Sequence, residues 1–70
     1  MALQYGRSRL IEHLARKKLS QAEFARRLGK SEAYVTQIIN GSTKFSLLTA
    51  KRAATILDCI IDDLYYWEID

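Results

Sequence analysis

The sequence predicts an all-α fold, in which residues 1–70 form one compact domain of five helices. We expect the core in residues 7–66, followed by a short aromatic and acidic C-terminal tail. Hydrophobic residues make up 49% of the chain, which is ample for a core. The composition includes no proline and three glycines, so helices joined by short turns fit it best.

The first two helices are marked by apolar spacing and by a capping signal. Leucine and isoleucine recur at helical spacing within residues 7–17, which predicts the first helix. The second helix begins at Ser20, because residues 20–23 (SQAE) have the capping-box form. In that form the serine hydroxyl accepts a hydrogen bond from the N–H of Glu23, and the glutamate reaches back. Gly29 ends the helix, since glycine adopts the left-handed conformation without steric cost.

Three further helices follow from serine caps and apolar spacing. Ser31 is the expected N-cap of a helix over residues 32–39, which ends at Asn40-Gly41. Ser46 is expected to cap a fourth helix that reaches residue 57. A short fifth helix is expected over residues 61–66, with acidic residues near its N-terminus.

The turn between the second and third helices is short enough to force a steep crossing. Only Gly29 and Lys30 separate the second helix from the cap of the third. A close crossing needs a small residue, which Ala25 supplies, and inward apolar residues on both helices. The outer face of the third helix is then free to enter the major groove of DNA. The residues on or beside that face are Glu32, Ala33, Tyr34, Thr36 and Gln37.

Charge is distributed unevenly along the chain. Residues 1–45 hold nine of the eleven Lys and Arg residues and three of the eight acidic residues. A basic front suits a polyanion such as DNA, although basic residues can also simply solvate helix faces.

The single cysteine allows no internal disulfide and favours a reducing, cytoplasmic setting. The apolar runs are far shorter than the roughly 20 residues that span a membrane.

With these residues in place, the sequence resembles a known family. The matching residues are Ser20 to Ser31 (SQAEFARRLGKS), Val35 to Ile38 (VTQI) and Asn40-Gly41. They look like the Cro/repressor-type helix-turn-helix family, also called Xre-like, and the resemblance extends from about Leu10 to Leu64. It implies a five-helix domain that binds operator DNA, commonly as a dimer, and regulates transcription.

The resemblance also implies residue roles. Gln21 matches the residue that contacts phosphate and braces the recognition helix. Base-reading positions fall at Glu32, Ala33 and Gln37, flanked by Ser31, Tyr34 and Thr36. The loop that grips phosphate matches Asn40, Ser42, Thr43 and Lys44. Lys30 departs from the family, where many members carry an apolar residue, and this leaves the turn able to meet phosphate.

The candidate reading residues differ in the roles that they could take. Gln37 can bond bidentately to adenine, which makes it the preferred candidate for direct readout. Glu32 either accepts a hydrogen bond from a base amine or only stabilises the helix start. Thr36 could touch a thymine methyl or a phosphate, and Tyr34 could meet phosphate or pack beside the second helix. Arg7 and Arg9 are further phosphate candidates beside Lys30 and Lys44.

Other reactive residue types form no catalytic or metal-binding pattern. His13 stands alone among apolar residues, and Cys59 reads as a small buried hydrophobe. Asp62 and Asp63 are adjacent, so their side chains diverge on a helix. We therefore expect no enzyme activity, no metal and no cofactor.

Tyr65, Tyr66 and Trp67 allow two interpretations. One or two of these rings could close the core against the first helix. Alternatively, the cluster forms a dimer interface, since aromatic residues are enriched at interface centres. We expect the interface, because a 70-residue domain cannot easily bury three consecutive large rings.

The sequence thus predicts a transcription regulator, specifically a repressor that reads a palindromic operator through the helix at residues 32–39. We expect a homodimer, formed in solution or only on DNA, with recognition helices about 34 Å apart. The alternatives are a protein-interaction module and an antitoxin-like partner built on the same fold.

Overall fold

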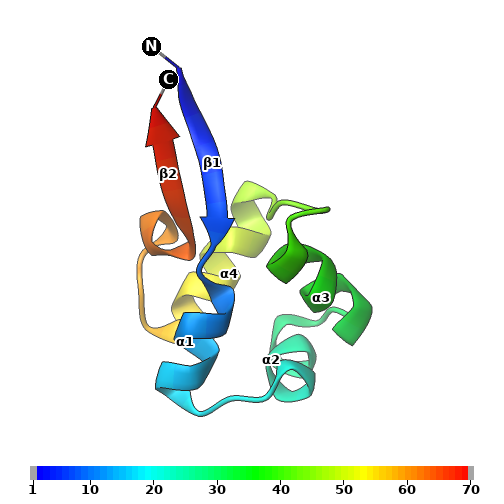
Figure 1. The fold of residues 1–70 in the computed structure, drawn as a ribbon. Coiled ribbons are helices and arrows are strands. Elements are labelled where there is room, and N and C mark those ends of the chain that lie inside the picture. Colours follow the sequence, from blue (N-terminus) through cyan, green and yellow to red (C-terminus); the bar gives the residue numbers. More distant parts are fainter. Residues whose placement is uncertain (1, 70) are drawn as a thin grey trace.

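The computed structural model describes residues 2–69 and shows helices with a two-stranded sheet at one end (Figure 1). In chain order the elements are β1 (Leu3–Ser8), α1 (Leu10–Lys17), α2 (Gln21–Leu28), α3 (Glu32–Asn40), α4 (Leu47–Leu57), the 3-10 helix η1 (Ile61–Leu64) and β2 (Tyr65–Ile69). The expectation of a purely helical fold with five helices is therefore wrong, although the domain is small and mostly helical.

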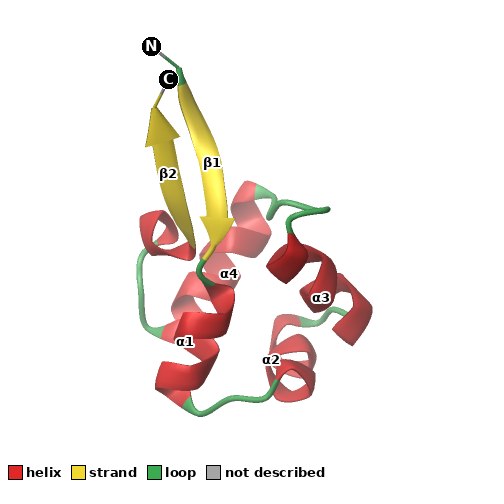
Figure 2. Cartoon of the chain, in the orientation of Figure 1, coloured by secondary structure: helices red, strands yellow, loops and turns green. Residues whose placement is uncertain are grey.

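The sheet joins the two ends of the chain. Strands β1 and β2 run antiparallel and project from the helices, with both termini at the far end (Figures 1 and 2). Leu3 pairs with Ile69 and Tyr5 with Trp67, and the register shifts between Tyr5 and Ser8. Gly6 lies within this irregular stretch, where an added Cβ would meet the carbonyl oxygen of Tyr66 at 2.5 Å. Glycine thus permits the close approach of the strands.

Two predicted helices change because of the sheet. The first helix was expected to begin at residue 7 but begins at Leu10, since Arg7 and Ser8 belong to β1. The fifth was expected over residues 61–66, but only the 3-10 helix Ile61–Leu64 forms, and Tyr65 already starts β2. Aromatic residues favour strands, and here a partner strand is available to accept their hydrogen bonds. The expected tail enters β2 as far as Ile69, and Asp70 lies outside the described residues.

The three serine caps are confirmed. The side-chain oxygens of Ser20, Ser31 and Ser46 each accept a hydrogen bond from a backbone N–H three residues later. Gly29 ends α2 in the left-handed conformation with φ of 78°. In the predicted capping box the Glu23 side chain also reaches back to Ser20. In the structure, the Glu23 carboxylate binds Arg26 and Arg27 instead.

The core lies between the four α-helices and η1. Its largest fully buried side chains are Phe24, Leu10, Ile38, Leu57, Leu64 and Val35. His13 is also buried, where Nε2 donates to the carbonyl oxygen of Asp63 at 2.7 Å and Nδ1 lies 3.2 Å from Arg16 Nη2. These contacts tie α1 to η1, so His13 acts as a structural residue.

Candidate nucleic-acid interface

Helices α2 and α3 bury facing sides and leave one side of α3 exposed. Phe24, Ala25 and Leu28 of α2 are buried, as are Val35 and Ile38 of α3. At the turn, the backbone N–H of Lys30 donates to the carbonyl oxygen of Ala25 at 2.9 Å. Figure 1 shows α3 at the right-hand side of the molecule, with α1 and α4 to its left and α2 below it. The predicted site residues that lie exposed along α3 are Glu32, Ala33, Thr36, Gln37 and Asn40.

One side-chain hydrogen bond links the start of α2 to the exposed face of α3. The hydroxyl of Thr36 donates to Oε1 of Gln21 at 3.4 Å, and both side chains are exposed. Gln21 is the first residue of α2, where backbone N–H groups have no partner inside the helix. The contact holds Gln21 beside the exposed face of α3.

The loop after α3 is tied to the same face. The Thr43 hydroxyl donates to Oε1 of Gln37 at 3.3 Å, while the Thr43 N–H donates to the backbone carbonyl of Gln37 at 3.2 Å. Oδ1 of Asn40 accepts from the N–H and the hydroxyl of Ser42 at 3.0 and 2.8 Å. Gly41 ends α3 with φ of 88°. These contacts fix the loop against the end of α3, close to Gln37.

Two lysines border the face at opposite ends of α3. Nζ of Lys30 lies 5.2 Å from the ring centroid of Tyr34. Nζ of Lys44 donates to the Gly41 carbonyl at 3.3 Å and lies 5.4 Å from the ring centroid of Tyr5. An ammonium group over an aromatic ring is held there by electrostatic attraction. Both lysines are therefore held beside the α3 face, and both remain exposed.

Tyr34 and Ser31, which flank the predicted base-reading positions, make contacts within the domain. Tyr34 is half-buried against the core, with its ring centroid 6.4 Å from that of Phe45, and burial raises the pKa of its phenol. The Ser31 hydroxyl accepts from the Tyr34 N–H at 3.1 Å as the α3 cap. Of the two alternatives for Tyr34, packing is therefore observed, chiefly toward Phe45.

The structure does not bring the two N-terminal arginines to the α3 face. The guanidinium groups of Arg7 and Arg9 each lie 5.1 Å from the ring centroid of Tyr66. Arg9 also lies 3.7 Å from the Glu12 carboxylate, which in turn accepts a hydrogen bond from the Tyr66 hydroxyl at 2.8 Å. Both arginines therefore belong to the side of the sheet that faces α1.

The three C-terminal aromatic residues are divided by the alternation of β2. Tyr65 is 4% exposed and its hydroxyl accepts from the Phe45 N–H at 3.3 Å, so this ring closes the core. Trp67 shares its side of the sheet, and Tyr66 points to the other side. Sequence reasoning missed their partner Tyr5, whose ring centroid lies 4.9 Å from that of Tyr65. The available signal was the aromatic and β-branched composition of residues 65–69 (YYWEI), which favours a strand.

Within residues 2–69, no group of three or more His, Cys, Asp or Glu side chains could hold a metal ion. None of the helices in this part of the chain is long and apolar enough to cross a membrane. Cys59 is partly buried, and this burial raises the pKa of its thiol.

A family model described as helix-turn-helix matches residues 10–64, which run from the first residue of α1 to the last residue of η1. None of the curated proteins compared with the chain is significantly similar to it. Both strands of the sheet lie outside the matched segment.

Proposed function

Because the chain belongs to the Cro/repressor-type helix-turn-helix family of DNA-binding regulators, we propose that it represses transcription from a palindromic operator that α3 reads. A single observation carries this proposal: the exposed face of α3 is braced from both ends, by Gln21 through Thr36 and by Thr43 through Gln37. Preorganised side chains lose little entropy on binding, which favours recognition of a defined sequence.

Gln37 has the chemistry for direct base readout. The Thr43 hydroxyl uses one lone pair of its carbonyl oxygen, which leaves the second lone pair and both amide N–H donors. That set suits a bidentate contact to N6 and N7 of adenine. Glu32, in the first turn of α3, can accept from the N4 amine of cytosine. Ala33 and Thr36 offer methyl groups to thymine.

The residues around the face would contact phosphate. Lysine and polar side chains at the borders of a recognition helix fix its register on the duplex without reading sequence. Gln21 and Lys30 would contact the backbone at one end of α3, with Ser31 and Tyr34 beside them. At the other end the contacts would come from Asn40, Ser42, Thr43 and Lys44. A homodimer in the cytoplasm would then present two α3 helices about 34 Å apart, one turn of DNA.

Selection of bound sequences from random DNA at a stated salt concentration tests this proposal. We expect a palindromic consensus. Gln37→Ala should relax one base position in each half-site by about 1–3 kcal/mol, because the bidentate contact is lost. Lys44→Ala should weaken all sequences equally and reduce the salt slope by about one, because one phosphate contact is lost.

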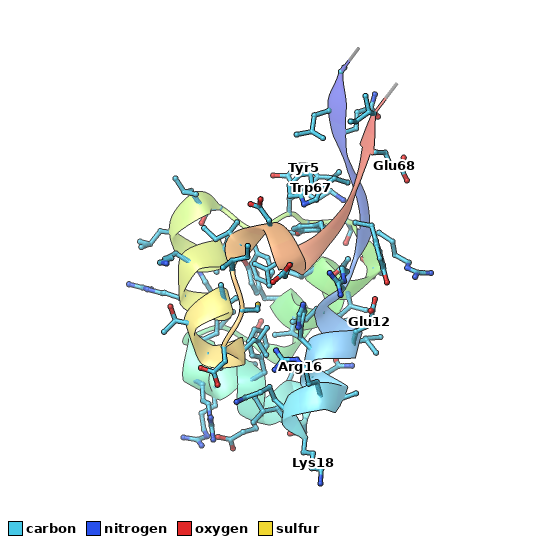
Figure 3. The ribbon with its side chains drawn as sticks, turned by 90° about the vertical axis from the view of Figure 1, so that its left-hand side faces the viewer. Tyr5, Glu12, Arg16, Lys18, Trp67 and Glu68 are labelled. Atoms are coloured by element: carbon cyan, nitrogen blue, oxygen red, sulfur yellow. The ribbon has the colours of Figure 1, made fainter. Side chains whose placement is uncertain are left out.

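Lys18→Ala is the matched control, since it removes the same charge from an exposed site at the end of α1, far from the sheet (Figure 3). It should change neither the consensus nor the affinity. A flat selection profile, or a consensus that Gln37→Ala leaves intact, would refute α3 as the reader of a defined operator.

A further inference from the structure

One side of the sheet carries an exposed apolar surface. Leu3 and Ile69 are 66% and 64% exposed, and they are paired across the strands on the same side as the pair Tyr5 and Trp67. Leu47, at the start of α4, is 78% exposed and lines a hollow together with Tyr5 and Trp67. We call these five residues the apolar sheet face. They are five of the nine large hydrophobic side chains exposed within residues 2–69.

The hollow makes this face concave at its base. It has a volume of about 130 Å³ and opens between β1, β2, η1 and the start of α4. Its lining residues are Tyr5, Phe45, Leu47, Ala50, Ile61, Leu64, Tyr65 and Trp67, and none of them carries a charge at neutral pH. An apolar ridge from another molecule could therefore fill it without desolvating an ion.

The opposite side of the sheet has a different character. There Tyr66 is covered by the guanidinium groups of Arg7 and Arg9 and donates to the Glu12 carboxylate. Figure 3 shows Tyr5 and Trp67 together on one side of the strands, with Glu68 directed to the other. Apart from Tyr66, the large exposed hydrophobic residues of the sheet are thus collected on one side, which is typical of an interaction surface rather than of scattered surface hydrophobes.

We propose that the apolar sheet face is the docking surface for a second copy of this chain, and this rests on the proposed function, which requires two α3 helices. An isologous contact brings the same patch of both copies together about a twofold axis. A patch with net charge would repel itself there, whereas the five side chains of the apolar sheet face carry no charge; the nearby cation is Lys44, whose Nζ lies over the Tyr5 and Tyr65 rings. A second copy of the chain can therefore cover this face, and no different partner with a complementary charge is needed.

The position of the face is compatible with DNA binding by both copies. In Figure 3 α3 lies behind the other helices, whereas Tyr5 and Trp67 project sideways from the sheet, so the two surfaces occupy adjoining sides. A copy docked on the sheet would leave α3 uncovered. Lys44 connects the two surfaces, since it lies over the Tyr5 ring and in the loop that follows α3. Both strands lie outside the segment that the family model matches.

Sedimentation velocity over a concentration series without DNA tests the proposal, with Trp67 emission as a second readout. Trp67 is the only tryptophan, so its emission should shift to shorter wavelength as dimers bury it. The double variant Leu47→Gln and Ile69→Gln should raise the dimer dissociation constant at least about tenfold, since truncating central interface residues has effects of this size. Ile11→Gln is the matched control, because Ile11 is 56% exposed on α1, and it should leave the constant unchanged.

DNA with one half-site and with two half-sites separates this proposal from the proposed function. The double variant Leu47→Gln and Ile69→Gln should bind DNA with one half-site as the wild type does. On DNA with two half-sites it should lose cooperativity. Failure of every variant to bind DNA would refute the proposed function, while the sedimentation result still decides the interface. If circular dichroism shows the double variant unfolded, Leu47→Gln alone replaces it.

Two results would overturn the interface. The first is a wild-type chain that stays monomeric in solution and binds two half-sites without cooperativity, which would leave the face to a different protein. The second is a folded double variant that dimerises as tightly as the wild type.

Discussion

The segment from Ser20 to Gly41 and the two-stranded sheet are built on different principles. In the first, each cap accepts from a backbone N–H three residues away, and α2 packs on the helix that directly follows it. In the sheet, Leu3 pairs with Ile69 at the opposite end of the chain. Local interactions thus specify the first region, whereas the second exists only once the helices have brought both ends together.

The two regions also differ in burial. The inner side chains of α2 and α3 are at most 4% exposed. In the sheet, Tyr65 is the buried side chain, while Tyr5, Trp67 and the strand ends stay between 40% and 66% exposed. We therefore expect the helix pair to carry the stability of the domain and the sheet to carry a smaller share.

The largest expected effect is that of Phe24→Ala in α2. Phe24 is fully buried, and removing its ring should lower the free energy of unfolding by about 3–5 kcal/mol. A hydrophobic core in a chain of about 70 residues rarely supplies more than about 3–5 kcal/mol, so the variant should be unfolded or close to it at 25 °C. Urea titration followed by circular dichroism measures the change.

Trp67→Ala is its counterpart in the sheet, because Trp67 is a large ring that remains 40% exposed. It should lower the free energy of unfolding by clearly less, with the helical signal retained. Equal losses for the two variants would contradict the difference that we draw between the regions.

An intermediate effect is expected for Gly6→Ala. The added methyl group would lie 2.5 Å from the Tyr66 carbonyl oxygen, so the strands must separate or shift. Overpacking of this kind lowers the free energy of unfolding by about 1–3 kcal/mol. The emission of Trp67 should change while the helical circular dichroism signal persists. Loss of the helical signal in parallel would mean that the sheet is required for the helices to fold.

The smallest expected effect concerns Glu23 on α2. A hydrogen bond from Arg27, supported by Arg26, lowers the pKa of the Glu23 carboxyl below its usual 4.5. Its stabilising contribution is therefore present above pH 4.5 and is lost as the pH falls through the lowered pKa. Glu23→Gln should reduce stability slightly at pH 7 and should match the wild type at pH 2.

High salt is the control, because screening should shrink the difference at pH 7. A difference between Glu23→Gln and the wild type that is as large at pH 2 as at pH 7 would contradict an electrostatic origin.

The helices were predictable because their signals lie within a few residues. The caps at Ser20, Ser31 and Ser46 are confirmed, and so is the helix end at Gly29. The prediction failed where a residue has two possible partners. Glu23 could reach back to its cap, but the arginines one turn later hold its carboxylate.

The chain ends were not predictable in the same way. In residues 65–69 only Tyr65 is buried, so burial does not alternate along β2, and a lone strand has no hydrogen-bond partner. The partner, β1, lies at the other end of the sequence and is also largely exposed. Neither segment identifies the other, so the sequence predicts Tyr65 and Tyr66 as the end of a short helix.

By itself the sequence determined the helix pair and the character of its exposed face, because spacing, caps and glycines act over one or two turns. Only the tertiary structure decided how the candidate site is braced, through Thr36 with Gln21 and Thr43 with Gln37. It also decided which rings of the C-terminal cluster are buried, since that depends on a strand pairing between opposite chain ends. Such long-range contacts are set by how the whole chain packs, and local patterns do not specify them.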